Sequence, residues 1–376
     1  MNVRARLLAV FFLVMLTSWA AAQPRANREG VLDHGALPDL EAFDTQGNRI
    51  KLRDLVAGQY TVLSAGCLTC PKFHQSYPVI EAASADYADR GVQFFYFYKS
   101  LRHPELDGYV EPLNIEERLL HVAEAKQKLG TRVPWIADTL EDSMRVGLRS
   151  GSLSVVLVSP EGEIVFASQE IDEVGLRSAL SEAVGPVTEP TSAADLDYLP
   201  RVLRAPRLAN EDSAWGVERP ATMTILSITP TTPDATYYVK LRAEADRDLL
   251  RTGTGRLFLG FYPDPIHEAK WNNLTPAMKY VLETPDGVTA SPNEATAAVG
   301  EGDSDTKPRQ FWVDIASDGP PGEATLTLHY YGCTPTFCTA MTQTYTIRFE
   351  AEDREARTYG FRRGGRERPS GERGAR

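Results

Sequence analysis

The hydrophobic pattern of this chain changes its period once, between residues 185 and 215. Before this segment, over residues 36–186, short apolar runs alternate with stretches in which apolar residues recur every three or four positions. After it, over residues 216–350, apolar and polar residues alternate and helical spacing almost disappears. Several prolines interrupt the segment between the two patterns. The sequence therefore predicts an α/β domain, a linker over 187–215 and an all-β domain.

The first half contains alternating strand and helix signals. Residues 92–98 (VQFFYFY) are too apolar for a surface strand and indicate the centre of a sheet. The resulting order, strand–helix–strand–helix–strand–strand–helix, is typical of a thioredoxin-like three-layer sandwich. Helices are expected at 71–89, 115–129 and 172–184, and further strands at 60–65, 134–137, 153–158 and 164–166.

The second half predicts short strands separated by turns that contain proline and glycine. In the last of them Tyr345, Ile347 and Phe349 alternate with polar residues, which is the pattern of a half-buried strand. Seven such strands favour an immunoglobulin-like β-sandwich. They are expected at 222–228, 237–243, 256–261, 279–283, 310–315, 325–331 and 344–350.

Residues 1–22 have the three parts of a secretory signal peptide. Two arginines precede an apolar run of thirteen residues, and three alanines then supply the small residues needed for cleavage before Gln23. The apolar run is shorter than a membrane-spanning helix requires, and an uncleaved membrane anchor is the alternative interpretation. We therefore expect an exported protein in an oxidising compartment, which in a bacterial source is the periplasm.

Charge and composition restrict the partners. The chain carries 51 acidic against 40 basic residues, a formal net charge of −11, which argues against nucleic acid as a partner. Residues 23–35 form a polar lead, and the Arg/Gly-rich tail over 351–376 lacks apolar periodicity and is expected to be disordered. No phosphate-binding glycine loop occurs and the histidines show no metal-ligand spacing, so neither a cofactor nor a metal is predicted.

The strongest chemical signal is the motif Cys67-Leu68-Thr69-Cys70, which lies between a predicted central strand and a predicted helix. Unpaired backbone N–H groups and the positive dipole end at a helix start lower the pKa of a thiol and favour the reactive thiolate. Pro71 leaves two alternatives open. If Pro71 is the first helical residue, Cys70 caps the helix and is the favoured thiolate. If the helix begins earlier, Cys67 is favoured.

A second pair, Cys333 and Cys338, is expected in a loop between two strands. Disulfides that close such short loops stabilise a fold by only about 2 kcal/mol, whereas linking distant segments would give about 5 kcal/mol. Short-loop disulfides also tend to be exposed and reducible. We therefore interpret both cysteine pairs as redox pairs, and structural stapling is the alternative.

Residues 36–186 resemble the iodothyronine deiodinases, a family with a thioredoxin fold. The resemblance is carried by Cys70-Pro71, which stand where that family has selenocysteine and proline, by His103-Pro104 with Asp107-Gly108-Tyr109, by the helix at 115–129, and by Val133-Pro134 with Asp138-Thr139. It implies that Cys70 is catalytic and that His103 donates or accepts a proton beside the sulfurs. An ordinary surface histidine is the alternative for His103.

The same segment departs from that family in ways that favour thiol chemistry. Cysteine replaces selenocysteine, Cys67 adds a partner three residues upstream, and the acidic residues before the family's histidine are absent. The loop over 149–152 also lacks the cis-proline that thioredoxin folds usually place beside the active site. These departures count against reductive deiodination. Thiol–disulfide exchange needs only paired and accessible sulfurs, so it is compatible with all of them.

Residues 216–350 resemble the N-terminal immunoglobulin-like domain of the DsbD thiol:disulfide interchange proteins. The resemblance is carried by Tyr331-Gly332-Cys333, by Phe337-Cys338 at a spacing one residue shorter than the family's, and by the strand that follows. In that family the two cysteines pass electrons to periplasmic acceptors. The resemblance therefore implies a second redox station at Cys333 and Cys338, with a membrane-bound protein as an electron donor.

Together these features predict an exported thiol–disulfide oxidoreductase with Cys67, Cys70 and His103 in its active site. Cys333 and Cys338 are predicted to take electrons from the first pair or from a separate donor. Protein thiols and disulfides, or a small-molecule reductant, are the expected partners, and the direction of electron flow and the oligomeric state stay open. One alternative is a deiodinase-like or peroxiredoxin-like enzyme centred on Cys70. The other is a secreted binding protein whose cysteines are structural.

Overall fold

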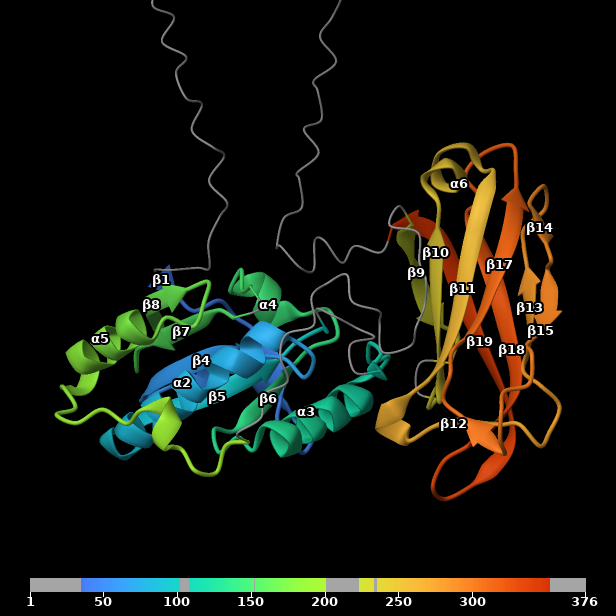
Figure 1. Ribbon diagram of the computed structural model, residues 1–376. Coiled ribbons are helices and arrows are strands. Elements are labelled where there is room, and N and C mark those ends of the chain that lie inside the picture. Colours follow the sequence, from blue (N-terminus) through green and yellow to red (C-terminus); the bar gives the residue numbers. More distant parts are fainter. Residues whose placement is uncertain (1–34, 102–107, 152, 201–222, 233–234, 352–376) are drawn as a thin grey trace, which may run out of the picture.

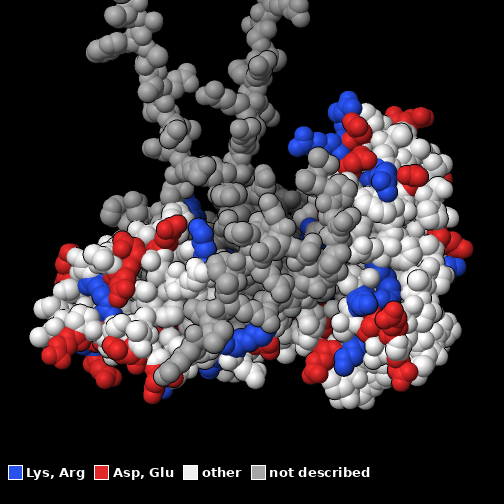
Figure 2. Space-filling model, in the orientation of Figure 1, with Lys and Arg blue, Asp and Glu red and all other residues white. Residues whose placement is uncertain are grey.

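The computed structural model describes residues 35–101, 108–151, 153–200, 223–232 and 235–351. These residues form two domains that lie side by side (Figure 1). The predicted signal peptide, His103, most of the predicted linker and nearly all of the predicted tail lie outside the described residues. No helix in the described part of the chain is long and apolar enough to cross a membrane. On the face drawn in Figure 2, acidic and basic side chains are interspersed over both domains.

The first domain is built on a mixed sheet of eight strands in the order β1-β8-β7-β4-β5-β6-β2-β3. β4 pairs in parallel with β5, and β5 with β6, whereas β7 runs antiparallel to β4. Because β4, β5 and β7 lie in the middle of the sheet, they are buried on both faces. The strands are β1 Gly35–Ala36, β2 Glu41–Phe43, β3 Arg49–Lys51, β4 Tyr60–Gly66, β5 Val92–Tyr98, β6 Trp135–Asp138, β7 Val155–Val158 and β8 Glu163–Ser168.

Helices cover both faces of this sheet. α2, α3 and α5 share one buried cluster with the sheet, and α1 and α4 share another on the opposite face. In α2 the buried residues Phe73, Tyr77 and Ile80 recur at helical spacing, so one side of the helix faces the core. The predicted three-layer α/β arrangement is therefore confirmed. The helices are α1 Leu52–Val56, α2 Pro71–Tyr87, α3 Ile115–Leu129, α4 Ser143–Gly147 and α5 Glu173–Val184.

α3 has both of its predicted ends, and each end has a local cause. At the start, the side chain of Asn114 accepts a hydrogen bond from the backbone N–H of Glu117 at 2.9 Å. At the end, Gly130 takes the left-handed conformation with a φ of 64°, which a residue with a side chain adopts only at a cost. The position of α3 matters because this helix contacts both the active-site region and the second domain.

The structure adds short elements that the sequence analysis did not predict, namely β1, β2, β3, α1 and α4. Each has two to five residues, which is too short for a hydrophobic period to show. Part of the predicted linker also packs on the first domain. Asp86 accepts hydrogen bonds from the backbone N–H and hydroxyl of Thr191, and Tyr198 donates to Glu81 at 3.0 Å.

The second domain is a sandwich in which every described strand pair is antiparallel. The order is β14-β17-β11-β10-β9-β19-β18-β12-β16, with β13 and β15 added beside β18. The two halves pack face to face, because Tyr280 of β13 contacts Phe261 of β11 and Phe311 of β17 at ring-centroid distances of 6.0 and 4.9 Å. This confirms the all-β sandwich. The strands are β9 Thr224–Pro230, β10 Val239–Ala245, β11 Gly255–Pro263, β12 Lys270–Asn272, β13 Lys279–Glu283, β14 Thr289–Ser291, β15 Glu294–Thr296, β16 Ser304–Asp305, β17 Arg309–Ala316, β18 Glu323–Cys333 and β19 Cys338–Ala351, with one helix, α6 Arg247–Thr252.

One prediction in this domain needs correction. The sequence analysis placed Cys333 and Cys338 inside a loop, whereas they are the last residue of β18 and the first of β19. The pairing of the two strands continues through Gly332 opposite Thr339 to the cysteines themselves. The beginning of β19 is threonine-rich and exposed, so it carries no alternation of apolar residues from which the strand could be predicted.

Candidate active site

The CxxC motif occupies the junction that the sequence predicts. β4 ends at Gly66, and α2 begins at Pro71. Cys70 is the residue that precedes the helix, with extended φ and ψ of −80° and 109°. Proline suits the first helical position because its missing N–H would have no partner in the helix. The geometry thus corresponds to the first of the two alternatives, in which Cys70 lies at the positive end of the helix dipole.

Neither cysteine of the motif forms a disulfide, and both are buried. Their exposed fractions are 1% for Cys67 and 2% for Cys70. The sulfur of Cys67 lies 3.6 Å from the hydroxyl of Thr69, within the range of a weak hydrogen bond. The side chain of Cys70 makes no capping hydrogen bond to α2. Thiol–disulfide exchange requires accessible sulfurs, so the burial of both thiols differs from what the sequence predicts. A substrate must therefore gain access to this junction before it can exchange electrons with the pair.

Gly66 is required immediately before the motif. A Cβ atom at this position would lie 2.3 Å from the Trp135 ring, closer than any side-chain carbon can approach. The ring of Trp135 also contacts Tyr98 of β5, at a centroid distance of 6.2 Å. Because Gly66 and Tyr98 are register partners, these aromatic rings lie directly beside the residue that leads into the motif. A larger residue at 66 would displace the rings that support it.

A buried tyrosine and histidine lie beside the motif. Tyr98 and His121 are both fully buried, and the Tyr98 hydroxyl is 3.0 Å from Nδ1 of His121. Burial, together with the neighbouring charges of Cys67 and Glu111, raises the pKa of Tyr98 well above its ordinary value. Burial, reinforced by the charge of Lys240, lowers the pKa of His121 to about 3, so the imidazole is neutral at pH 7. Among the described residues, its Nε2 atom has no hydrogen-bond partner.

This pair was not predicted from the sequence, because the histidines show no metal-ligand spacing and nothing else singled out His121. The signal that could have identified it is the apolar face of the helix at 115–129, on which a polar histidine falls among buried positions. His103, the histidine that was predicted for the site, lies outside the described residues and stays a prediction. The pair places a hydroxyl and an imidazole beside the motif, and the proton-transfer role predicted for His103 is not assigned to it.

The segment that leaves β5 is fixed by a buried network. Asp142 accepts hydrogen bonds from the backbone N–H and the hydroxyl of Ser100, and it pairs with the guanidinium groups of Arg118 and Arg145 at 3.1 and 2.9 Å. Burial opposes ionisation of Asp142, but the two guanidinium charges hold the pKa of its carboxyl below the ordinary value. Leu101 follows Ser100 in the chain, and its backbone N–H donates a hydrogen bond to Glu111 at 3.0 Å.

The second cysteine pair forms a disulfide, and its surroundings differ from those of the first pair. Cys333 and Cys338 are directly opposite each other at the tip of the β18–β19 hairpin. Cys338 is exposed and Cys333 is partly so. Phe337, 37% exposed, packs its ring edge-on against Tyr238, with 5.4 Å between ring centroids. The disulfide is therefore accessible without a change in the fold.

A buried ionic cluster joins the two domains. Lys240 of β10 lies 2.5 Å from Glu117 of α3 and 3.3 Å from Asp264, and His267 contacts the other oxygen of Glu117 at 3.3 Å. Lys240, Glu117 and Asp264 are each less than 5% exposed. Burial opposes ionisation of Glu117, but the hydrogen bond from His267 and the charge of Lys240 lower its pKa to about 2. The carboxylates and the imidazole converge as metal ligands would, and the ammonium of Lys240 supplies the positive charge among them.

The cluster also places the hairpin disulfide close to the interface between the domains. His267 packs against Tyr238 at a ring-centroid distance of 5.2 Å, and Tyr238 in turn packs against Phe337. A continuous series of contacts therefore runs from Glu117, at the start of α3, to the residue before Cys338. No local sequence pattern around His267 indicates this series of contacts.

No family model and no curated protein matches this sequence. Among solved structures, the chain is similar to a protein assigned as the thiol:disulfide interchange protein DsbE of Chlorobium tepidum, with 15% identity and a TM-score of 0.33 over 41% of this chain and 99% of that one. It is also similar to a thiol:disulfide interchange protein from Bacteroides sp., with 18% identity and a TM-score of 0.31 over 42% and 94% of the two chains. A third is the thioredoxin domain of a thiol-disulfide oxidoreductase from Bacteroides vulgatus, with 18% identity and a TM-score of 0.30 over 40% and 96%.

Proposed function

We propose that this protein is a thiol–disulfide oxidoreductase that uses Cys67 and Cys70 as its exchanging pair. One observation carries the proposal. Two reduced cysteines, three positions apart, lie between the end of a central strand and the first turn of a helix. The unpaired N–H groups of the helix start favour a thiolate at this place, and the second cysteine is near enough along the chain to form a disulfide with the first.

The proposed reaction transfers two electrons in two exchange steps. The thiolate of Cys70 attacks one sulfur of a substrate disulfide, a mixed disulfide forms, and the other substrate sulfur leaves as a thiolate. Cys67 then loses its proton and attacks the sulfur of Cys70. The Cys67–Cys70 disulfide forms, and the second substrate sulfur leaves. The cysteine pair is oxidised and the substrate is reduced, and the same steps in reverse oxidise a substrate dithiol.

We assign the attacking role to Cys70 because Pro71 is the first residue of α2, which places Cys70 at the cap. Cys67 lies beside the buried pair of Tyr98 and His121. A histidine with a pKa of about 3 is a weak base at pH 7, so His121 is poorly suited to store the proton that Cys67 releases. We therefore assign Tyr98 and His121 a positioning role, in which their polar groups set the electrostatic environment of the Cys67 thiol.

We further propose that Cys333 and Cys338 form a second exchange station on an exported protein. What supports this is the exposed hairpin disulfide and the series of contacts that leads from it to the first domain. The predicted signal peptide supports export, and a membrane-bound protein would then be a donor of electrons to one of the two pairs.

The central test is to reduce the full chain, react it with iodoacetamide at a series of pH values, and locate the modified cysteines by mass spectrometry. We expect Cys70 to react first, with a midpoint below the ordinary thiol pKa of about 8.5. Incubation with oxidised insulin should then yield a mixed disulfide in Cys67→Ser but not in Cys70→Ser. Resistance of both thiols to iodoacetamide, together with the absence of any mixed disulfide, would contradict the proposed function.

The relay between the pairs has its own test. In a Cys67→Ser/Cys338→Ser variant, the remaining Cys70 and Cys333 should form a disulfide between the domains when a redox buffer is made gradually more oxidising. The matched Cys70→Ser/Cys338→Ser variant tests Cys67 in the same way. If neither variant forms an interdomain disulfide at any redox potential, the relay is wrong and the two pairs act separately.

The binding-protein alternative treats all four cysteines as structural, yet only Cys333 and Cys338 form a disulfide in the structure. Two reduced thiols at a helix start favour the enzyme over the binding protein. Deiodinase-like or peroxidase activity centred on Cys70 predicts sulfenic acid on that residue after peroxide treatment, which a dimedone probe detects. An exchanger should instead form the Cys67–Cys70 disulfide under the same treatment.

A further inference from the structure

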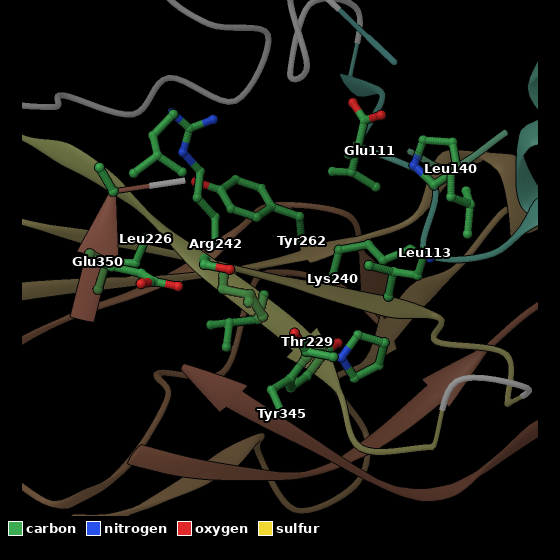
Figure 3. A pocket seen from close by; sticks show the side chains of 18 of the residues that line it. Glu111, Leu113, Leu140, Leu226, Thr229, Lys240, Arg242, Tyr262, Tyr345 and Glu350 are labelled. Carbon is green, nitrogen blue, oxygen red and sulfur yellow. The ribbon is translucent and has the colours of Figure 1, made fainter. Parts of the chain in front are cut away.

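A cleft of about 670 Å³ lies where the two domains meet (Figure 3). Residues 110–113 and Arg118 of the first domain line one side, and β9 and β10 of the sandwich line the other. Its volume falls within the range of 300–1,000 Å³ that is typical of binding pockets. The wall that contains Glu111 follows β5, whereas the CxxC motif follows β4, the parallel neighbour of β5. The cleft wall and the motif therefore come after neighbouring strand ends.

Two strands separate to form this cleft. β9 and β10 pair only at Thr224 and Ile225, and beyond these positions residues 226–230 and 240–242 line the cleft instead of pairing with each other. β9 is bonded on its other side to β19, and β10 to β11. The cleft is therefore an opening within the strand order of the sandwich.

The backbone directions show which groups face into the opening. In antiparallel pairs the N–H and C=O groups of successive residues point to opposite neighbours. The N–H of Thr231 bonds to β19, so by alternation the backbone groups of Ile228 point toward β10. The C=O of Tyr238 accepts a hydrogen bond from the N–H of Asp264, the residue after β11. By the same alternation, the backbone N–H and C=O groups of Leu241 point toward β9. At one end, the side-chain amide of Gln343 accepts a hydrogen bond from the backbone N–H of Val239 and donates one to its C=O. This side chain closes the cleft at that end.

The basic side chains that line the cleft are already paired with carboxylates, which argues against an anionic ligand. Lys240 pairs with Glu117 at 2.5 Å, and Arg118 pairs with Asp142 at 3.1 Å. Arg242 pairs with its neighbour Glu244 at 2.5 Å. What this leaves for recognition is backbone groups on two facing strands, aliphatic side chains and the exposed carboxylate of Glu350. An extended polypeptide matches this lining, because its own N–H and C=O groups alternate between its two edges.

The buried ionic cluster holds the cleft open in advance of binding. Lys240 is both a lining residue and the group that binds Glu117, so the distance between the two domains is fixed beside the cleft. A preformed site avoids the entropic cost of ordering its walls when a ligand binds. This distinguishes the cleft from an opening that would close as the domains move.

We propose that this cleft captures an extended segment of a client polypeptide, which adds a strand between β9 and β10 while a disulfide elsewhere in the client reaches Cys70. The inference rests on the proposed thiol–disulfide exchange and deepens it, since it names unfolded or extended polypeptide as the substrate class. The second domain would then serve the first as its substrate-binding platform.

The test uses the full chain and two probes, the fluorescein-labelled, carboxamidomethylated insulin B chain for binding and intact insulin for reduction. Ile228→Arg introduces a charge at a lining position that also packs against the sandwich core, and it should weaken the B-chain Kd by about tenfold or more and raise KM for insulin to a similar extent. Thr229→Arg, at an exposed lining position that tolerates the change, should act in the same direction. Val165→Arg, at an exposed valine of β8, is the matched control and should change neither value.

Reduction of 2-hydroxyethyl disulfide separates capture from chemistry, because this small substrate needs no strand pairing. Its kcat/KM should be the same in wild type and in both cleft variants. The proposal is overturned if B-chain binding is unchanged in both variants, or if the small disulfide loses as much activity as insulin. If wild type reduces neither disulfide but binds the B chain through Ile228, the proposed exchange fails while the cleft assignment holds.

Discussion

The two cysteine pairs of this chain have similar sequence spacing and opposite environments. Cys67 and Cys70 are reduced, buried thiols between a central strand and a helix start, whereas Cys333 and Cys338 form a disulfide at an accessible hairpin tip. The first pair can draw on the backbone N–H groups of a 17-residue helix, while the second lies between two strands and has no helix beside it. The comparison teaches that cysteine spacing does not fix reactivity, because the element in which the pair lies sets the stability of the thiolate.

The sharpest way to break this comparison is to remove each pair in turn. Cys67→Ser/Cys70→Ser should lower the rate of insulin reduction on the order of a thousandfold, since it removes both nucleophiles. Cys333→Ser/Cys338→Ser should leave the reduction of 2-hydroxyethyl disulfide within about twofold of wild type, because the first pair acts on a small substrate without the second. The turbidity of precipitating insulin chains measures the first rate, and an NADPH-coupled assay measures the reduction of 2-hydroxyethyl disulfide. Equal losses in both variants would show that the pairs are chemically equivalent.

The buried cluster between the domains allows a second comparison, of a buried ion pair with an exposed one. Lys240→Met leaves Glu117 and Asp264 buried without their ammonium partner, so we expect the free energy of unfolding to fall by about 3–5 kcal/mol. The control Arg49→Met removes the exposed pair with Glu41 and should cost less than about 1 kcal/mol. Urea unfolding followed by circular dichroism measures both. A Lys240→Met variant as stable as the control would mean that the cluster does not hold the domains together.

The same cluster predicts a dependence on pH. The pKa of Glu117 is lowered to about 2, so its contribution is fully present above its ordinary pKa of about 4.3 and is lost as the pH falls toward 2. The stability difference between wild type and Glu117→Gln should therefore be about 3 kcal/mol at pH 7 and shrink as the pH approaches 2. Urea unfolding at pH 7, 5, 4 and 3 measures the difference, and Glu41→Gln serves as the exposed control. A difference that is constant over this range would contradict the assignment.

The smallest expected effect concerns the hairpin disulfide as a staple. Reduction of Cys333–Cys338, or its replacement by serines, should lower the free energy of unfolding by about 2 kcal/mol, because the loop that it closes is short. Urea unfolding of the oxidised full chain against the Cys333→Ser/Cys338→Ser variant measures this. A loss of about 5 kcal/mol or more would favour the structural interpretation of the second pair over the redox one.

Much of the fold could be predicted from the sequence because its long elements are strongly periodic. The helix at 115–129 and the strands at 92–98 and 279–283 have the predicted bounds. The strand–turn–helix junction around the CxxC motif was predicted as well, because an apolar run, two cysteines and a proline follow one another directly. Short elements such as α4 could not be predicted, since five residues show no period.

The surroundings of the thiols could not be predicted in the same way. Tyr98 and His121 lie 23 positions apart, and they meet only because α3 crosses the end of β5. The ionic cluster joins Glu117 to Lys240, which is 123 positions away in another domain. No local pattern records such pairs, because each pair joins two segments that are distant in sequence and meet only in the folded chain.

By itself, the sequence determined the two fold classes, the junction that holds the thiols, and which residues could be nucleophiles, because these depend on local periodicity and on backbone chemistry at a helix start. Only the tertiary structure decided that Pro71 begins the helix, that His121 rather than any neighbour along the chain lies beside Tyr98, and that the domains meet around Lys240. The physical reason is that burial and the pairing of charges depend on which surfaces come together. That is a property of the packed chain and not of any short stretch of it.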